Sequence, residues 1–257
     1  MLKKEIQDNI VIARISDGDT NAITIEILRE LKAIIDEVND TEALKGLVLT
    51  GEGRFFSSGF SLTTLIGFET GEAAVAFFEE QEHILLNYFT CKKPVVCALN
   101  GHAAAMGVIL AMASDYRIAA NHPKIKIGMS EIKIGLPLSV AQSAIVRFGL
   151  DSDKKYRDVM YFGEMMGPKH ALEMGMVDEV VDGQTLIHRA KEIVCQWIDT
   201  PNRPFIHIKR ELKADVVEKI RRNLDKGEWK SLISETMINK AVKDALTVAQ
   251  AAMERKK

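Results

Sequence analysis

Residues 95–113 read VVCALNGHAAAMGVILAMA, and the change of character within this stretch decides the fold. The apolar run 95–99 predicts a buried strand, and residues 108–113 predict an apolar helix. Between the two lie Asn100, Gly101 and a series of small residues. A strand that passes through small residues directly into a helix is the βα step of an α/β fold.

The same alternation continues on both sides of this stretch. Further short β-rich runs, each bounded by Gly, Asn, Asp or Pro, occur at residues 10–15, 46–50, 116–119 and 124–128. Between them, residues 23–39 and 73–88 place apolar side chains at helical spacing. Strands that alternate with helical crossovers of this length predict an α/β domain with mostly parallel pairing.

Beyond Gly135 the pattern becomes mainly helical. Residues 140–148, 168–174 and 184–198 read as helices, and 177–181 as a short strand. Two prolines, Pro201 and Pro204, interrupt the pattern before two charged amphipathic helices at 205–222 and 228–255. We therefore expect a core of residues 1–199 and a helical C-terminal region of residues 200–257, which must pack on the core or on a neighbouring subunit.

Composition and charge exclude several classes of partner. The 257 residues contain 34 Lys plus Arg and 36 Asp plus Glu, for a net charge of −2, so no basic surface for nucleic acid is expected. No apolar run reaches the roughly 18 residues of a membrane span. The three cysteines form no CxxC motif and the histidines form no HxxxH pair, so we expect neither disulfides nor a metal site. The start of the chain has no apolar signal core, and a cytoplasmic location is expected.

Two segments place small residues where a strand leads into a helix, at 51–62 and at 100–107. The first N–H groups of a helix are unpaired, and they can bind an anion or a developing oxyanion where side chains leave room. Small residues at such a place also simply allow a helix to pack closely on a sheet. Neither segment matches a phosphate-binding loop or a dinucleotide-binding motif.

Two acidic residues are of interest. Glu131 lies near Met129, Ile132 and Ile134, and apolar surroundings would raise its pKa and make it a usable acid or base. An isolated glutamate can equally be a solvated turn residue. Asp115 is expected either to accept hydrogen bonds from backbone N–H groups or to pair with Arg117.

Taken together, these segments resemble the crotonase, or enoyl-CoA hydratase/isomerase, superfamily. The resemblance is carried, in chain order, by GEGRFFSSGFSL at 51–62, KPVVCALNG at 93–101, SDYRIA at 114–119, GMSE at 128–131 and ALEMGMVDEVV at 171–181. It is collinear from the first strand to about Trp197. It implies a spiral of ββα units with a helical C-terminal oligomerisation region.

The resemblance also implies an acyl-CoA thioester as substrate, with no cofactor beyond the coenzyme A that the substrate carries, and a homotrimer or a hexamer of paired trimers. Two backbone N–H groups, carried over onto Phe60 and Met106, would hold the thioester oxygen. The substrate-binding residues that it implies are Ser58, Gly59, Phe60, Ser61, Leu62, Met106 and Gly107.

The reaction is indicated by a departure from the hydratase pattern. Hydratases of this family use two glutamates, but this sequence has Ile109 at the first position and Glu131 at the second. An arrangement with one glutamate resembles that of the mitochondrial-type Δ3,Δ2-enoyl-CoA isomerases. Glu131 is therefore the expected catalytic residue of a double-bond shift through a dienolate. A hydratase or thioesterase of the same fold is the nearest alternative. Ile109 together with Met106, where the family generally has glycine, would also suit a non-catalytic acyl-CoA-binding protein.

Overall fold

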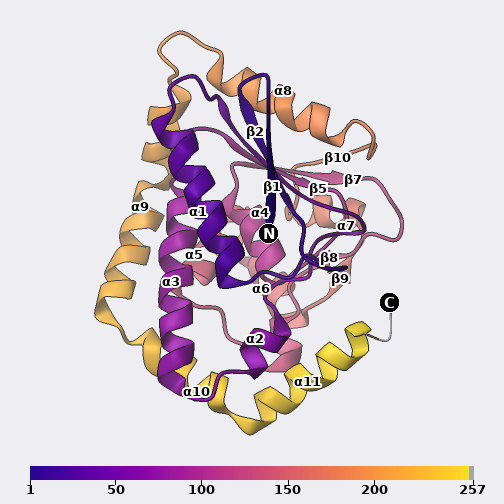
Figure 1. Cartoon of the computed structure of the whole chain (residues 1–257), viewed down its shortest axis with the longest axis vertical. Helices are drawn as coiled ribbons and strands as arrows, with labels where there is room; N and C mark the ends of the chain where they lie inside the picture. Colours follow the sequence, from indigo (N-terminus) through magenta and orange to yellow (C-terminus); the bar gives the residue numbers. More distant parts are fainter. Residues whose placement is uncertain (255–257) are drawn as a thin grey trace.

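The computed structural model describes residues 1–254, which form two sheets enclosed by helices (Figure 1). The larger sheet has the order β1 (Leu2–Gln7), β2 (Ile10–Ile15), β3 (Gly46–Gly51), β5 (Val95–Leu99), β7 (Tyr116–Ala120) and β10 (Glu179–Val181). The smaller sheet has the order β4 (Phe55–Ser57), β6 (His102–Ala104), β8 (Ile127–Gly128) and β9 (Met165–Met166).

Three successive units of the chain follow the same path. Each begins in a strand of the larger sheet, continues in a strand of the smaller sheet and then enters a helix. The units are β3, β4, α2 (Leu62–Ile66) and α3 (Gly71–Phe89), then β5, β6 and α4 (Met106–Ala113), then β7, β8, the 3-10 helix η1 (Glu131–Ile134) and α5 (Val140–Gly149). Neighbouring units pair in parallel in both sheets. The predicted α/β spiral of ββα units is confirmed.

The central strands of the larger sheet are buried on both faces. All residues of β3 and β5 are buried, as expected for parallel strands covered by helices on either side. Helix α1 (Ile25–Asp40) packs beside α3 (Figure 1), and α8 (Leu186–Ile198) contacts β3 and β5. The remaining core helices are α6 (Asp153–Phe162) and α7 (Pro168–Glu173).

The strand β1 is not indicated by the sequence pattern. It pairs antiparallel with β2 across a two-residue turn in which Asp8 and Asn9 have φ angles of 54° and 63°. Both signs match the type I′ turn that suits the twist of a hairpin. Because β1 lies at the edge of the sheet and is almost wholly exposed, it carries no apolar pattern that could signal it.

The C-terminal region consists of α9 (Phe205–Lys226), α10 (Trp229–Ile238) and α11 (Lys240–Glu254). The prediction of one helix from 228 to 255 is wrong, because the chain turns at Asn239, whose side-chain oxygen accepts from Ala241 N at 2.9 Å. Helix α10 packs on α3, and α11 crosses one end of the molecule to contact α2 and η1 (Figure 1). Arg255 and the last two residues of the predicted region lie outside the described residues. No helix within residues 1–254 is both long and apolar enough to cross a bilayer.

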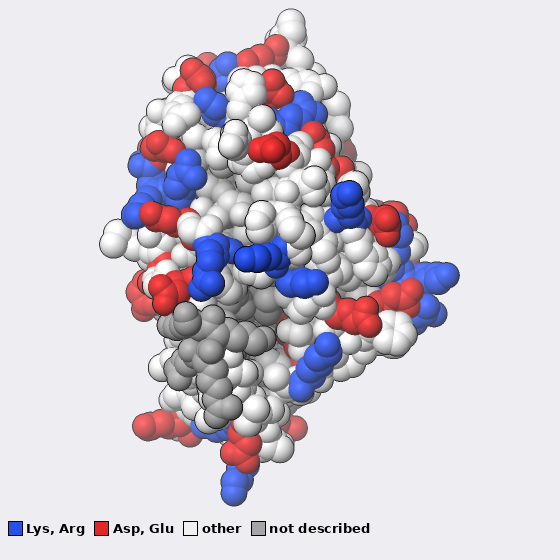
Figure 2. Space-filling model, turned by 90° about the vertical axis from the view of Figure 1, so that its right-hand side faces the viewer, with Lys and Arg blue, Asp and Glu red and all other residues white. Residues whose placement is uncertain are grey.

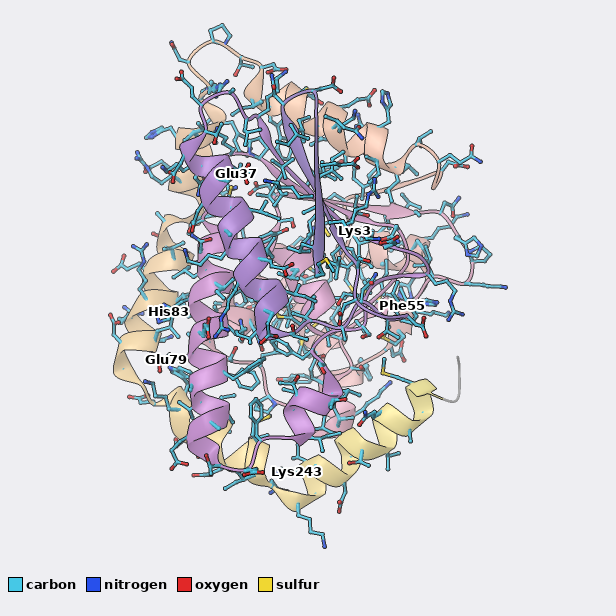
Figure 3. The ribbon with its side chains drawn as sticks, viewed as in Figure 1. Lys3, Glu37, Phe55, Glu79, His83 and Lys243 are labelled. Carbon is cyan, nitrogen blue, oxygen red and sulfur yellow. The ribbon has the colours of Figure 1, made fainter. Side chains whose placement is uncertain are left out.

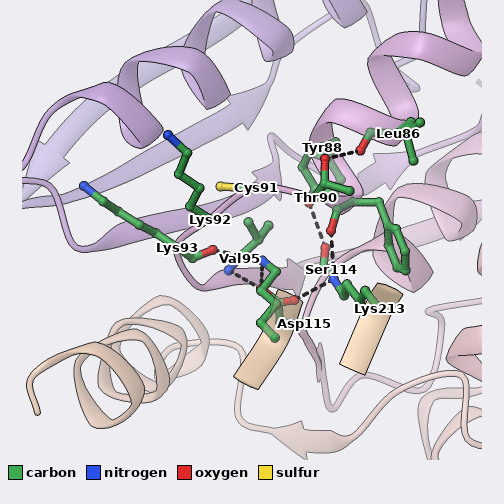
Figure 4. A network of polar contacts seen from close by, with 12 residues as sticks. Leu86, Tyr88, Thr90, Cys91, Lys92, Lys93, Val95, Ser114, Asp115 and Lys213 are labelled. Atoms are coloured by element: carbon green, nitrogen blue, oxygen red, sulfur yellow. Dashed lines mark hydrogen bonds and ion pairs between the residues drawn. The ribbon is translucent and has the colours of Figure 1, made fainter. Parts of the chain in front are cut away.

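A buried ion cluster attaches α9 to the sheet (Figure 4). Asp115 accepts from Val95 N at 2.9 Å, from Lys209 Nζ at 2.5 Å and from Lys213 Nζ at 2.7 Å. Its expected contact with backbone N–H is confirmed, but the pairing with Arg117 is wrong. Arg117 pairs instead with Asp178 at 2.7 Å. Both lysines are more than 90 residues from Asp115 in the chain, which is why local spacing could not reveal them.

Candidate active site

A cavity of about 600 Å³ lies where β4, β6 and the start of α4 face η1 and α11. Of the residues that the sequence predicted, Ser58, Phe60, Leu62, Met106 and Glu131 line this cavity. Gly59, Ser61 and Gly107 are not among its lining residues. The structure therefore brings the predicted base and both predicted backbone donors to one space.

The backbone around Phe60 leaves one N–H group available. The flanking groups donate within the protein, Ser58 N to Thr20 O, Gly59 N to Ser57 Oγ and Ser61 N to Ile23 O. Phe60 forms a parallel bridge with Ile23, in which Ile23 bonds to residues 59 and 61 and the N–H of Phe60 points to the other side. Among residues 1–254 the Phe60 N–H has no acceptor.

The second donor, Met106 N–H, belongs to the first residue of α4, where an N–H has no acceptor one turn earlier in its own helix. Gly59 brings the two segments together: a Cβ built on it would lie 2.7 Å from Ala105 Cβ and 3.2 Å from Met106 N. Its φ of 98° is also one that favours glycine. This close approach places the Phe60 segment against the amino end of α4.

Gly107 and Ser61 do not line the cavity, but they help to position the elements that do. A Cβ on Gly107 would lie 2.7 Å from Ser57 O, so glycine lets α4 pack against β4. The Ser61 hydroxyl accepts from Thr64 N at 3.3 Å and so caps α2. Met106 is 1% exposed and packs in the main core as well as lining the cavity.

Glu131 is the first residue of η1 and is only 6% exposed. Burial raises the pKa of its carboxyl to about 7, although nearby backbone N–H groups act in the opposite direction. Its Oε2 has no hydrogen-bond partner among the described residues. The neighbours that the sequence suggested explain this only in part, because Met129 is buried whereas Ile132 is 50% exposed. The burial of Glu131 therefore comes from the cavity walls and not from its own segment alone.

One end of the cavity is basic. Arg54, His102 and Lys126 line it, and no ion pair of Arg54 or Lys126 forms within residues 1–254. Burial and these two cations lower the pKa of His102, which favours its neutral form. Figure 2 shows Lys and Arg side chains gathered beside a hollow in the middle of one face of the molecule. Such an end suits an anionic group of a ligand.

The other end of the cavity is apolar. Leu65 of α2, Phe78 of α3 and Met237 of α10 line it, and all three belong to a small apolar cluster separate from the main core. Helix α11 adds Ala249, Ala252 and Met253 to the walls. Sequence reasoning missed these residues as part of the site. Their helical spacing indicates only an apolar face, and it does not indicate what that face covers.

Comparison with known proteins places the sequence among enoyl-CoA hydratases and isomerases. The family model described as enoyl-CoA hydratase/isomerase matches residues 5–252. The mitochondrial enoyl-CoA delta isomerase 1 of Mus musculus is 24% identical over 247 residues, which cover 94% of this chain and 84% of the relative. A probable enoyl-CoA hydratase of Bacillus subtilis is 26% identical over 192 residues, or 74% of this chain and 73% of that protein.

A solved structure confirms the architecture. The crystal structure of human mitochondrial delta3-delta2-enoyl-CoA isomerase superimposes with a TM-score of 0.91 at 20% identity, covering 100% of this chain and 99% of that one. At this identity the likeness shows the fold, which is the crotonase fold. Because the family model spans nearly all of the sequence, the chain belongs to the enoyl-CoA hydratase/isomerase family.

Proposed function

We propose that the protein moves a double bond from the Δ3 to the Δ2 position of an enoyl-CoA. The observation that carries this proposal is that Glu131 is the only carboxylate among the described residues that line the cavity. Ile109 also lines the cavity. By the resemblance, it stands at the first of the two glutamate positions of the hydratases, so this carboxylate is replaced by an apolar side chain. Addition of water requires one group to deprotonate the water and another to protonate carbon, whereas a double-bond shift requires a single proton shuttle.

In the proposed mechanism, the ionised Glu131 removes a proton from C2 of the 3-enoyl thioester. The electron pair of the broken C–H bond moves into the conjugated system, and the thioester oxygen becomes an oxyanion that the N–H groups of Phe60 and Met106 stabilise. The protonated Glu131 then returns the proton to C4, which leaves the double bond between C2 and C3. No atom is gained or lost, and the carboxyl ends ionised as it began.

The two ends of the cavity support an acyl-CoA as the ligand. Arg54 and Lys126 at the basic end suit the phosphates of coenzyme A. The apolar end, with Leu65, Phe78 and Met237, suits the tail of the acyl chain. The reacting carbons would then lie between them, beside Glu131.

The test is to incubate the protein separately with 3-hexenoyl-CoA and 2-hexenoyl-CoA and to identify the products by mass spectrometry and absorbance. We expect 2-hexenoyl-CoA to form from the 3-enoyl substrate. Formation of 3-hydroxyhexanoyl-CoA or of free coenzyme A as the main product would replace the assignment by a hydratase or a thioesterase. Tight binding without any product would indicate an acyl-CoA-binding protein.

We also propose that the chain assembles with copies of itself as a homotrimer. The apolar residues Phe148, Ile208 and Leu212 are 37%, 61% and 67% exposed and line one shallow hollow on α5 and α9. Exposed apolar groups of this kind are common at interfaces between subunits. Sedimentation equilibrium should give the mass of three chains, and Leu212→Glu should reduce it. A monomer in the wild type would contradict the proposal.

A further inference from the structure

A second buried carboxylate, that of Glu82, lies in the middle of α3 and takes no part in the proposed reaction. Glu82 is 0% exposed and forms no ion pair among the described residues. Its Oε2 accepts from Ala141 N at 2.6 Å, and its Oε1 from the Ser139 hydroxyl. Burial raises the pKa of Glu82 to about 7, while these hydrogen bonds lower it. The carboxylate of α3 therefore meets the amino end of α5, where unpaired N–H groups favour an anion.

The segment that Glu82 contacts, residues 136–142, forms one wall of the cavity. Leu136, Leu138 and Gln142 all line the cavity, and they lie just before or within the first turn of α5. The near end of this segment is tied to the proposed base, because Leu136 N donates to Glu131 O at 3.0 Å. Its far end is the pair of contacts from Ser139 and Ala141 to Glu82. The segment between them has no regular secondary structure of its own.

Gln81, the neighbour of Glu82 on α3, fixes the same wall. Gln142 Nε2 donates to Gln81 Oε1 at 2.8 Å, and Gln142 Oε1 accepts from Ser139 N at 3.1 Å. Adjacent residues of α3 thus fix both the start of α5 and the one polar side chain that α5 adds to the cavity. Leu136 and Val140 also pack on the apolar cluster that closes this end of the cavity.

We propose that Glu82 is a positioning residue that sets acyl-chain preference by holding the wall formed by residues 136–142. The inference rests on the proposed function, since it takes this apolar end as the place of the acyl tail. A C4 acyl group ends near Glu131 and does not need this wall, whereas a C8 group must extend along it. Loss of the Glu82 contacts would therefore impair the binding of long acyl groups more than that of short ones.

The test compares the Kd of octanoyl-CoA with that of butanoyl-CoA, measured by calorimetry. In Glu82→Ala we expect octanoyl-CoA to bind about tenfold more weakly, because the wall loses both contacts, while the Kd of butanoyl-CoA changes less than about twofold. Glu82→Gln keeps an acceptor for Ala141 N and should recover most of the octanoyl-CoA affinity. Ser139→Ala, which removes one hydroxyl only, should show a smaller loss with the same selectivity.

The matched control is Glu79→Gln, on the same helix (Figure 3) but paired with Lys230 at the surface. It should leave both affinities unchanged. A parallel loss for the two ligands, or no loss for either in both Glu82→Ala and Ser139→Ala, would overturn the proposal. Because a saturated thioester has no double bond to move, its binding does not depend on isomerase activity. Failure of the isomerase assay would therefore refute the proposed reaction and leave this measurement unaffected.

Discussion

Asp115 and Glu131 are two buried carboxylates of the same chain with opposite surroundings. Asp115 meets two lysines and a backbone N–H, and although burial acts to raise its pKa, the lysines lower the pKa below its ordinary value. Within residues 1–254, Glu131 meets no cation and one of its oxygens has no partner, and burial raises its pKa to about 7. A paired carboxylate stays ionised and holds elements together, whereas an unpaired one can exchange a proton near neutral pH. The difference explains why Asp115 holds elements of the fold together and why Glu131 is the group that we propose for the chemistry.

The largest effect on turnover is expected from Glu131→Gln. Loss of the proposed proton shuttle should reduce kcat with 3-hexenoyl-CoA by a factor of about 1,000 or more. The affinity for octanoyl-CoA should change little, because glutamine has nearly the same shape. At pH 8 the variant should melt at a higher temperature than the wild type, which must bury an ionised carboxylate there. An unchanged kcat would remove Glu131 from the mechanism.

Asp115→Ala should lower the stability of the fold, because Asp115 belongs to the buried ion cluster and not to the cavity. Removal of the acid leaves Lys209 and Lys213 buried without a counterion, and we expect a loss of about 3–5 kcal/mol in the free energy of unfolding. Urea denaturation measures this loss. Asp178→Ala, which breaks the more exposed pair with Arg117, is the control and should have a clearly smaller effect. Equal losses in the two variants would contradict the special role of the buried cluster.

Gly59→Ala tests the proposed backbone donors independently of the proposed base, Glu131. The added Cβ would lie 2.7 Å from Ala105 Cβ and would push the Phe60 segment away from the amino end of α4. We expect kcat to fall about 100-fold, as for the loss of one oxyanion donor. The apparent pKa of Glu131 in the pH profile should stay the same. A kcat within a factor of two of the wild type would show that Phe60 N–H is not a donor to the substrate.

The smallest expected effect is the pH dependence of the wild type. Only ionised Glu131 can remove a proton, so kcat/KM should be lost as the pH falls through the raised pKa of about 7. Below that value the rate should fall about tenfold per pH unit, and above it the rate should level off. The melting temperature, recorded over the same range, distinguishes titration from unfolding. A midpoint near pH 4.5 would show that Glu131 is solvated in the free enzyme.

The larger sheet could be predicted because its central parallel strands are largely apolar runs such as 46–50 and 95–99, bounded by turn residues. In the smaller sheet, β8 (Ile127–Gly128) lies within the run predicted at 124–128, of which only these two residues are strand. The strands of this sheet have two or three residues, and no period can be detected over that length. Helix α6 was also missed, because its sequence DKKYRDVMYF is polar and Val159 is its only buried residue.

From motifs, the candidate site was predictable at its proposed reacting centre and at the neighbouring Ser58 and Leu62. Glu131, Phe60 and Met106 lie in segments whose order along the chain resembles the family. The walls contributed by Phe78, Met237 and α11 come from elements far apart in sequence, and an apolar helical face carries no information about its partner. The same holds for Asp115, whose nearest basic residue in sequence, Arg117, is not the one that it binds.

Ala105, the residue before Met106, has φ 51° and ψ −124°, a backbone conformation that alanine seldom adopts. Holding a non-glycine residue there is unfavourable by about 1–3 kcal/mol. Glycine at this position would be an attractive choice in a programme to increase heat resistance, because it relieves that strain. The same replacement would give the Met106 amide more freedom of orientation, so thermal tolerance and catalytic efficiency should trade against each other at this single site.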